Sequence, residues 1–129
     1  MGDLTGRADI DRLLEAFYAQ VRRDPLLAPA FAHISEEAWP AHLQRIGDFW
    51  ETVLFARPKY RGSPFLPHLR LGLTAAHFER WLALFEETLR AHFQGPKAEE
   101  ALTRARQMAT LFLSKIAYYQ AHPEEKPLL

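Results

Sequence analysis

Apolar residues recur at helical spacing along most of this chain, and one segment rich in proline and glycine, from Arg57 to Leu73, interrupts the repeat. The residues that share a helix face are Ile10, Leu13, Leu14, Phe17 and Val21, then His42, Ile46, Phe49, Trp50 and Val53, then Phe78, Trp81, Leu82, Phe85 and Leu89, and last Leu102, Ala105, Ala109, Phe112, Leu113 and Ile116. This period predicts about four main helices, and no stretch alternates as a half-buried strand would. We therefore expect an all-α fold.

Local signals indicate where these helices begin and end. Asp9 is the expected N-cap of the first helix, and Pro40 fits the first turn of the second, where a backbone N–H has no helical partner anyway. Thr74 can cap the third helix, which ends at Gly95-Pro96. The tail from His122 carries two prolines and is expected to be frayed.

Length and composition limit the classes of protein to which this chain can belong. Its 129 residues fit one domain, residues 1–129, with an ordered core from about 9 to 121. With 16 basic and 16 acidic residues the net charge is zero, which argues against nucleic acid as a partner. No cysteine is present, so thiolate catalysis and cysteine-held metal clusters are excluded. The sequence shows no signal-peptide pattern and no apolar run of bilayer length, which predicts a cytoplasmic protein with no membrane partner.

The interrupting segment is too apolar to be a solvated linker. Its large apolar residues are Phe65, Leu66, Leu69 and Leu71. Long irregular segments in small helical domains are usually functional or disordered. His68 lies in this segment, and His42 lies on the apolar face of the second helix. An apolar slot with a histidine on each side suits haem, because one imidazole can ligate the iron and the other can face what binds opposite.

From the residues alone, other interpretations stay open for these side chains. His68 can be an exposed loop histidine, and His42 can be a satisfied histidine of the core. Trp81 taken by itself favours core packing. The cations and the phenol near the loop are solvated, or else they supply the positive charge and hydrogen bonds that haem propionates need: Lys59, Tyr60, Arg61 and Arg70.

An ordered set of short motifs resembles a known family. The pieces are Phe17-Tyr18, Val21-Arg22, Asp24-Pro25-Leu26-Leu27, Pro29-Ala30-Phe31, Trp39-Pro40-Ala41-His42, Phe49-Trp50, Val53-Leu54, Tyr60-Arg61-Gly62-Ser63-Pro64, His68, and His77-Phe78-Glu79-Arg80-Trp81-Leu82-Ala83-Leu84-Phe85. Together they span about residues 10 to 116 and resemble the third group of truncated haemoglobins, which are short bacterial-type globins. The glycine pairs typical of other truncated groups are missing, which is itself a trait of this group. The resemblance implies a truncated globin fold, a two-over-two helical sandwich around haem.

The resemblance also implies roles for individual residues. His68 would be the proximal ligand to the iron of haem b, and Tyr18, His42 and Trp81 would form a polar distal site. The residues that would contact the haem are Phe31, Ile46, Phe49, Phe65, Phe78, Met108 and Phe112, with Tyr60 near the propionates and Trp50 at the haem edge or against the neighbouring helix. Pro40 departs from the polar residue expected between Trp39 and His42.

His77 is the competing candidate for the iron ligand. It lies four residues before Trp81, so the two side chains share a helix face and cannot easily serve opposite sides of one flat cofactor. That spacing favours His68, and His77 is not carried over from the family as a ligand.

The leading hypothesis for function is a haem protein that binds dioxygen or another diatomic ligand at ferrous iron. An alternative is a redox enzyme of the nitric oxide dioxygenase or peroxidase type, with an unidentified reductase as partner, because polar groups around haem can activate oxygen or peroxide. The alternative of another class is a haem-free helical interaction module, which the visible spectrum of the purified protein separates from the other two.

Overall fold

The computed structural model describes residues 1–59, 72–122 and 124, and within them every regular element is helical. The elements are α1 (Arg7–Val21), the short 3₁₀ helix η1 (Ala28–Phe31), α2 (Trp39–Phe55), α4 (Ala75–His92) and α5 (Pro96–Ala121). The expected all-α fold is confirmed. Most of the interrupting segment and most of the tail predicted to be frayed lie outside the described residues.

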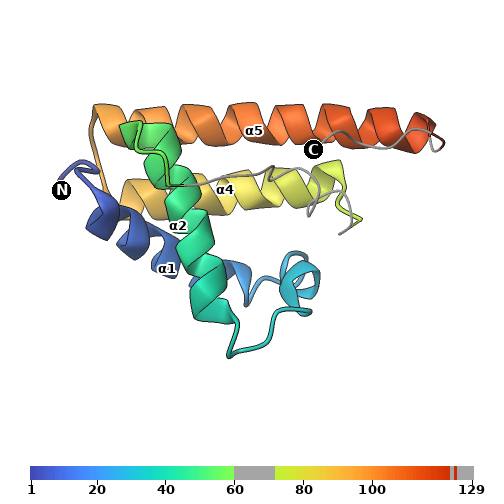
Figure 1. Cartoon of the computed structure of the whole chain (residues 1–129), viewed down its shortest axis with the longest axis horizontal. Coiled ribbons are helices and arrows are strands. Elements are labelled where there is room, and N and C mark those ends of the chain that lie inside the picture. Colours follow the sequence, from blue (N-terminus) through green and yellow to red (C-terminus); the bar gives the residue numbers. More distant parts are fainter. Residues whose placement is uncertain (60–71, 123, 125–129) are drawn as a thin grey trace.

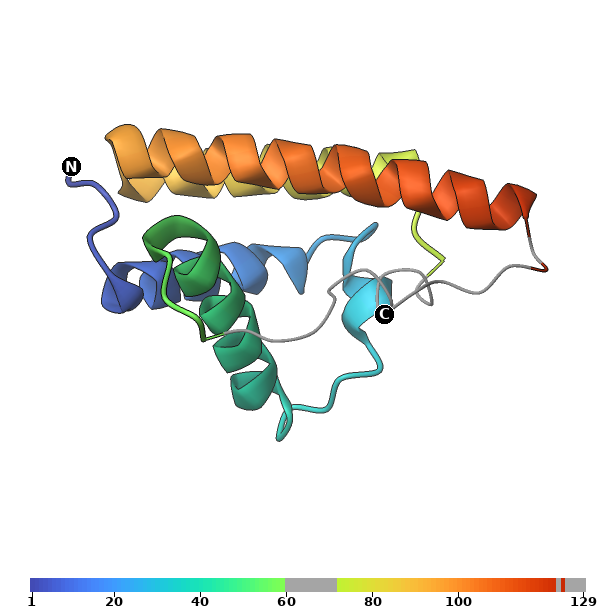
Figure 2. The ribbon, with the colours of Figure 1, turned by 45° about the horizontal axis from the view of Figure 1, so that its top comes forward.

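Two pairs of helices form the body of the molecule (Figure 1). Helices α4 and α5 run antiparallel side by side, joined by a short turn, and they stay adjacent when the molecule is rotated (Figure 2). Helix α1 packs against α4, and α2 crosses α1 so that the end of α2 meets the start of α5. This is the expected two-over-two arrangement, in which the first turns of α2 extend past α1 and away from α5.

The predicted apolar faces form the core. All the predicted core residues of α1 are buried, and Phe17 meets Phe85 of α4 edge-on with ring centroids 5.2 Å apart. Neither ring is exposed to solvent, and full burial of such a side chain contributes roughly 1.5–3 kcal/mol. A second, smaller cluster lies between the start of α4 and the later turns of α5; its members are Leu73, Phe78, Ala109, Phe112 and Ile116.

The predicted helix boundaries hold at α4 and α2 and fail at α1. Thr74 is the N-cap of α4, and its N–H donates to Nδ1 of His77 at 3.1 Å in a capping box. Pro40 lies in the first turn of α2. The expected N-cap Asp9 is wrong: the helix begins at Arg7, so Asp9 lies in its first turn. Leu4, before the helix, is buried. The Asp9 carboxylate instead accepts hydrogen bonds from the N–H and the hydroxyl of Thr5, at 2.9 and 2.7 Å.

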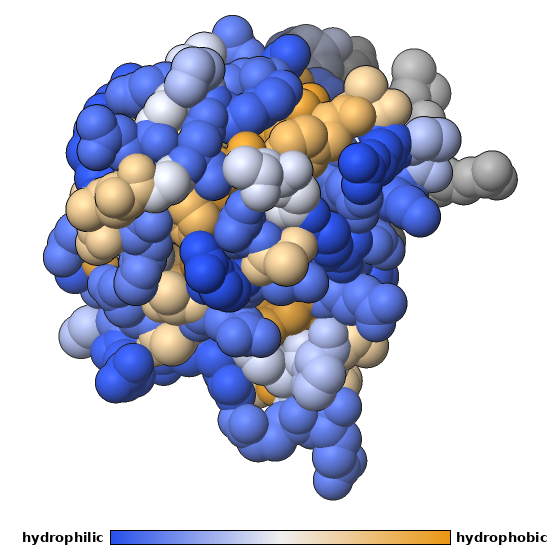
Figure 3. All heavy atoms as spheres, turned by 90° about the vertical axis from the view of Figure 1, so that its left-hand side faces the viewer, coloured by the Kyte–Doolittle hydropathy of each residue, from blue (hydrophilic) through white to orange (hydrophobic). Residues whose placement is uncertain are grey.

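The start of α5 is held by a residue from the other end of the sequence. The Asp3 carboxylate accepts hydrogen bonds from the N–H groups of Lys97 and Ala98 at 2.9 and 2.8 Å, as an N-cap side chain would. Gly95 has a φ of 143°, and a Cβ there would lie 2.5 Å from the Asp3 side chain, so a glycine is required. Burial raises the pKa of Asp3, but the backbone donors outweigh it and leave that pKa below its usual value. Figure 3 views the molecule from the end at which α5 starts, where the surface is mostly hydrophilic.

Charged groups fix the middle of α2 to α1. The Arg7 guanidinium donates to Asp48 at 2.7 Å and to Glu51 at 2.9 Å, both on α2, and to Asp11 on its own helix at 2.9 Å. Gly47 permits this approach, because a Cβ there would lie 2.6 Å from the guanidinium. The pKa of the buried Glu51 carboxyl is held below its usual value chiefly by the hydrogen bond from Arg7. Helix α2 is thus anchored through its middle turns.

Candidate functional site

Two of the predicted distal residues contact the same aromatic ring, that of Phe17. Tyr18, in the last turn of α1, is 6% exposed, and its ring centroid lies 4.7 Å from that of Phe17. Trp81 of α4 meets Phe17 at 5.5 Å. Burial raises the pKa of Tyr18 to about 12, and the Trp81 indole acts in the opposite direction. At neutral pH Tyr18 is therefore a protonated donor shielded from water.

The ring of Trp81 is fixed by a stack of aromatic side chains. It lies on Phe85 with ring centroids 5.4 Å apart and planes inclined at 11°, and Phe85 lies on Trp50 of α2 at 5.4 Å and 14°. Phe17 closes the side of the stack, edge-on to Trp81 at 5.5 Å. Each such ring pair adds about 0.5–1.5 kcal/mol beyond burial, so Trp81 has one well-defined position. Trp50 is buried in this stack, and its contact with haem stays a prediction.

His42 reaches the same region from the first turn of α2. Its ring centroid lies 5.2 Å from that of Trp39 and 6.3 Å from that of Phe31, and its Nε2 atom is buried. The ring of Tyr18 contacts the same two side chains, at 5.8 Å for Phe31 and 6.1 Å for Trp39. Tyr18 therefore shares Phe17 with Trp81 and shares Phe31 and Trp39 with His42, so the structure brings the predicted distal residues together.

Trp39 and Arg22 belong to this cluster, although neither was predicted to have a role in the site. Trp39 is 8% exposed, and the guanidinium of Arg22 lies 4.3 Å above its ring. Arg22 is also ion-paired with Glu36. Spacing was the signal available for Trp39, which lies three residues before His42 and so shares its helix face. Arg22 follows the end of α1 and reaches Trp39 only through the fold.

The residues predicted to line the haem form the rim of the core. Four of them pack against the larger cluster and remain partly exposed: Phe31, Ile46, Phe49 and Met108. Phe78 and Phe112 belong to the smaller cluster with ring centroids 6.4 Å apart, and Leu82 packs against both clusters. A flat, largely apolar group needs apolar walls from several elements and polar partners on one side. The described residues supply both, so they fit haem.

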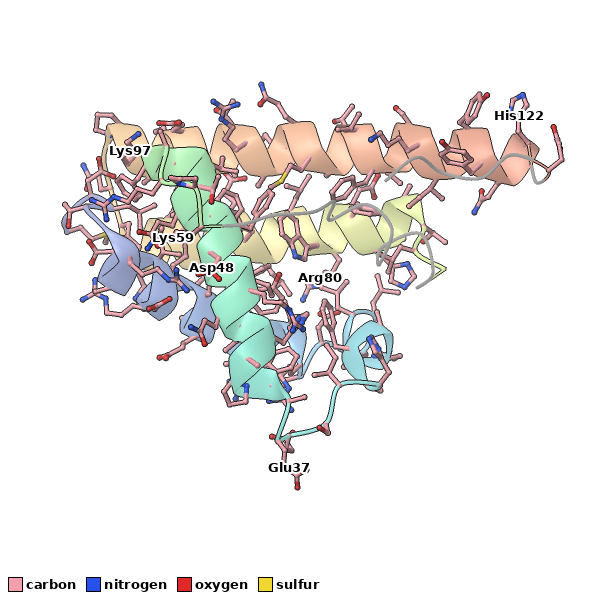
Figure 4. The ribbon with its side chains drawn as sticks, in the orientation of Figure 1. Glu37, Asp48, Lys59, Arg80, Lys97 and His122 are labelled. Carbon is pink, nitrogen blue, oxygen red and sulfur yellow. The ribbon has the colours of Figure 1, made fainter. Side chains whose placement is uncertain are left out.

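Several predicted residues lie outside the described part of the chain: Tyr60, Phe65 and His68, together with Arg61 and Arg70. Proximal ligation by His68 therefore stays a prediction. The competing histidine, His77, is described, and its Nδ1 accepts the Thr74 N–H in the cap of α4. Of the cations considered for the propionates, Lys59 is exposed beside α2 (Figure 4), and its N–H donates to Oγ1 of Thr52 at 3.1 Å.

The described residues, 1–59, 72–122 and 124, hold neither a cluster of metal-binding side chains nor a helix suited to cross a membrane. In these ranges no three histidine, aspartate or glutamate side chains gather as a metal site. Haem iron needs only one or two axial protein ligands, so this finding does not weigh against haem. Over the same ranges, no helix combines the length and the apolar character that crossing a membrane requires.

Comparisons with known proteins agree with this fold. The sequence model of the family described as bacterial-like globin matches residues 2–114. The chain is 36% identical over 117 residues to the group 3 truncated hemoglobin ctb of Campylobacter jejuni, covering 88% of this chain and 92% of that protein. The crystal structure of the group III truncated hemoglobin from Campylobacter jejuni superimposes with a TM-score of 0.83 at 35% identity, covering 90% of this chain and 95% of that one.

The chain belongs to the bacterial-like globin family. Within that family it is a group III truncated haemoglobin, as the motifs Phe17-Tyr18 and Trp39-Pro40-Ala41-His42 and the run from His77 to Phe85 indicated. Membership of a globin family implies that the protein binds haem.

Proposed function

We propose that this protein binds haem b and holds dioxygen, or another diatomic ligand, at ferrous iron. His68 would be the proximal ligand, and Tyr18, His42 and Trp81 would form the distal side. The observation that carries the proposal is the aromatic cluster in which Tyr18 shares the neighbour Phe17 with Trp81 and the neighbours Phe31 and Trp39 with His42. A buried phenol is seldom left without a partner, so a protonated hydroxyl here is well suited to a ligand that accepts a hydrogen bond.

Tyr18 would be the principal donor on the distal side. When bound, haem would supply a ferrous centre that takes a diatomic ligand and places partial negative charge on it. With a pKa of about 12, Tyr18 keeps its proton across the physiological range and can donate to such a ligand. One hydrogen bond of this kind contributes on the order of 1 kcal/mol or more in a dry site.

Trp81 would act on the ligand through Tyr18. Its indole N–H would donate to the Tyr18 oxygen, in line with the lowering effect that Trp81 has on the Tyr18 pKa. Hydrogen bonds in series polarise one another at low dielectric, so such a bond would both orient the Tyr18 hydroxyl and make it a better donor. This differs from three donors that each reach the ligand independently, and it predicts unequal effects of substitution.

His42 would be the second polar group of the distal side. Its buried Nε2 and its place beside Trp39 and Phe31 put the imidazole at the edge of the cluster away from Trp81. A neutral imidazole can donate or accept according to its tautomer. Because His42 lies in the first turn of α2, its position depends on how that turn is held.

Apolar side chains would enclose the cofactor and exclude water. The proposed lining consists of Phe31, Ile46, Phe49, Phe65, Phe78, Met108 and Phe112, with Trp50 and Tyr60 at the periphery. Each 100 Å² of apolar surface removed from water contributes roughly 2.5 kcal/mol, and the exclusion of water strengthens the hydrogen bond from Tyr18.

The absorption spectrum of the purified protein tests the proposal. We expect a haem spectrum that shifts on reduction and again on addition of carbon monoxide. His68→Ala should lose haem or bind it weakly, whereas the matched control His77→Ala should keep it. A colourless protein that takes up no added haem would contradict the proposal, and the reverse result for the two variants would transfer the proximal role to His77.

A further inference from the structure

The start of α2 is attached to the molecule differently from its middle and end. The Lys97 Nζ of α5 donates to the Leu54 carbonyl at the end of α2 at 2.6 Å, and Arg7 binds its middle. Near its start, the contact is made by Arg22, which covers Trp39 at 4.3 Å and pairs with Glu36, a side chain that is 82% exposed. The chain just before α2 projects away from the body of the molecule, as the position of Glu37 shows in Figure 4.

Trp39 lies between this surface contact and the distal residues. Its ring has Arg22 over it, while its other ring neighbours are His42 at 5.2 Å, Tyr18 at 6.1 Å and Phe31 at 6.2 Å. With only 8% of its surface exposed, the indole closes this side of the cluster. A small molecule that approaches Tyr18 and His42 from the Arg22 side meets the Trp39 ring first.

We infer that Trp39 is a positioning residue and gate of the distal pocket, held closed by the guanidinium of Arg22. In the closed position it supports the ring of His42, and its displacement admits a diatomic ligand toward Tyr18. The inference rests on the proposed function, because it assigns the gate to a haem pocket.

The contact that closes the gate is weak enough to open often. Arg22 is partly exposed, and a cation over a tryptophan at an exposed site favours the closed form by only about two- to fivefold. The ion pair with Glu36 adds little, because water and salt screen exposed charges. By contrast, the partly buried Trp81 stacks on Phe85, which is fully buried and stacks in turn on Trp50. A gate has to open for each ligand that enters, and the weaker of these contacts, that of Arg22 with Trp39, lies at the proposed gate.

The chain offers a matched control on α1, the helix that Arg22 follows. Arg12 also lies over an aromatic ring, that of Phe93 at 5.2 Å, and also pairs with a carboxylate, that of Asp9 at 3.3 Å. None of these residues touches the rings of the distal cluster. Arg12→Gln therefore removes the same kind of interaction as Arg22→Gln without reaching the pocket.

Carbon monoxide binding to the reduced haem protein, followed after flash photolysis and by ligand displacement, tests the gate. Arg22→Gln should raise the association and the dissociation rate constants together, by about two- to fivefold. The equilibrium affinity should change little, because a gate alters the barrier and leaves the end states alike. Arg22→Lys keeps a cation and should restore most of the wild-type rates, and Arg12→Gln should leave both rates as in the wild type.

A second readout follows the cluster itself. In proton NMR spectra of the carbon monoxide complex, the ring resonances of His42 should move in Arg22→Gln and stay in place in Arg12→Gln. Equal rebinding rates in Arg22→Gln and Arg12→Gln, provided that both variants still bind carbon monoxide, would overturn the gate and leave the proposed function intact. So would a changed affinity at an unchanged association rate. A protein that binds neither haem nor carbon monoxide would overturn the proposed function instead.

Discussion

The two sides of Tyr18 are built from different kinds of contact. On the α4 side, Trp81 lies on Phe85 in a stack that also holds Trp50, and the rings of Phe85 and Trp50 are buried. On the α2 side, the ring beside His42 is Trp39, which meets Tyr18 and Phe31 edge-on and has a partly exposed arginine over its ring. Disturbing a buried stack costs several kcal/mol, whereas an exposed ion pair contributes at most about 1 kcal/mol. The donor to the ligand is thus held rigidly, and the approach to it is held loosely.

Removal of the central ring of the stack should produce the largest effect. Phe85 lies between Trp81 and Trp50 and is not exposed, so Phe85→Ala should lower the free energy of unfolding by about 3–5 kcal/mol. Urea denaturation of the wild type and the variant gives this number. Phe85→Leu fills much of the space and should cost clearly less. A loss below about 1 kcal/mol for Phe85→Ala would mean that the α4 side is not the rigid one.

Removal of the donor itself should act on ligand release. Tyr18→Phe should raise the dioxygen dissociation rate by roughly tenfold, since about 1.4 kcal/mol corresponds to that factor. Carbon monoxide carries less charge on its outer atom, so its dissociation rate should change less. Stopped-flow displacement measures both rates, and an unchanged dioxygen rate would show that Tyr18 donates nothing to the ligand.

Trp81→Phe provides the matched comparison for Tyr18→Phe. If Trp81 acts on the ligand through Tyr18, as proposed, Trp81→Phe should raise the dioxygen dissociation rate by less than Tyr18→Phe. In the Tyr18→Phe background it should add almost nothing, since the two residues act as one unit. Fully multiplicative effects would show instead that Trp81 reaches the ligand directly.

The sequence predicted those features, such as helix caps and buried faces, that depend on neighbours within a turn or two of one helix. The Thr74 cap, Pro40 in a first turn and the buried faces of α1 and α5 follow from spacing alone. The residues alone favoured core packing for Trp81, and only the family resemblance placed it beside Tyr18. Their shared contact with Phe17 depends on how α1 packs against α4, and the periodicity of the sequence carries no information on that packing. The same holds for Arg22 over Trp39, because the two lie on different elements.

Asp3 tests whether stability and ligand binding are separable. Asp3→Ala removes the acceptor for Lys97 and Ala98 at the start of α5 and should cost about 1 kcal/mol, as lost caps do, without changing ligand rates. The folded pKa of Asp3 lies below its ordinary value of 3.8, so its contribution is present above pH 3.8 and is lost as the pH falls through the folded value. Unfolding measured at neutral and acid pH checks this. Asp3→Asn, which does not titrate, should lose that part of the acid dependence.

The smallest effect on ligand rates should come from Glu36, the outermost residue on the α2 side of Tyr18. Glu36→Gln removes the ion pair but leaves Arg22 over Trp39, so the carbon monoxide association rate should rise by less than twofold. Added salt screens exposed charges over about 3 Å at 1 M, so it should reproduce this rise in the wild type and have little further effect in Glu36→Gln. If Glu36→Gln matched Arg22→Gln in size, the ion pair and not the ring contact would close the gate. The difference between the two variants therefore measures how much of the hold on Trp39 comes from the guanidinium lying on the indole.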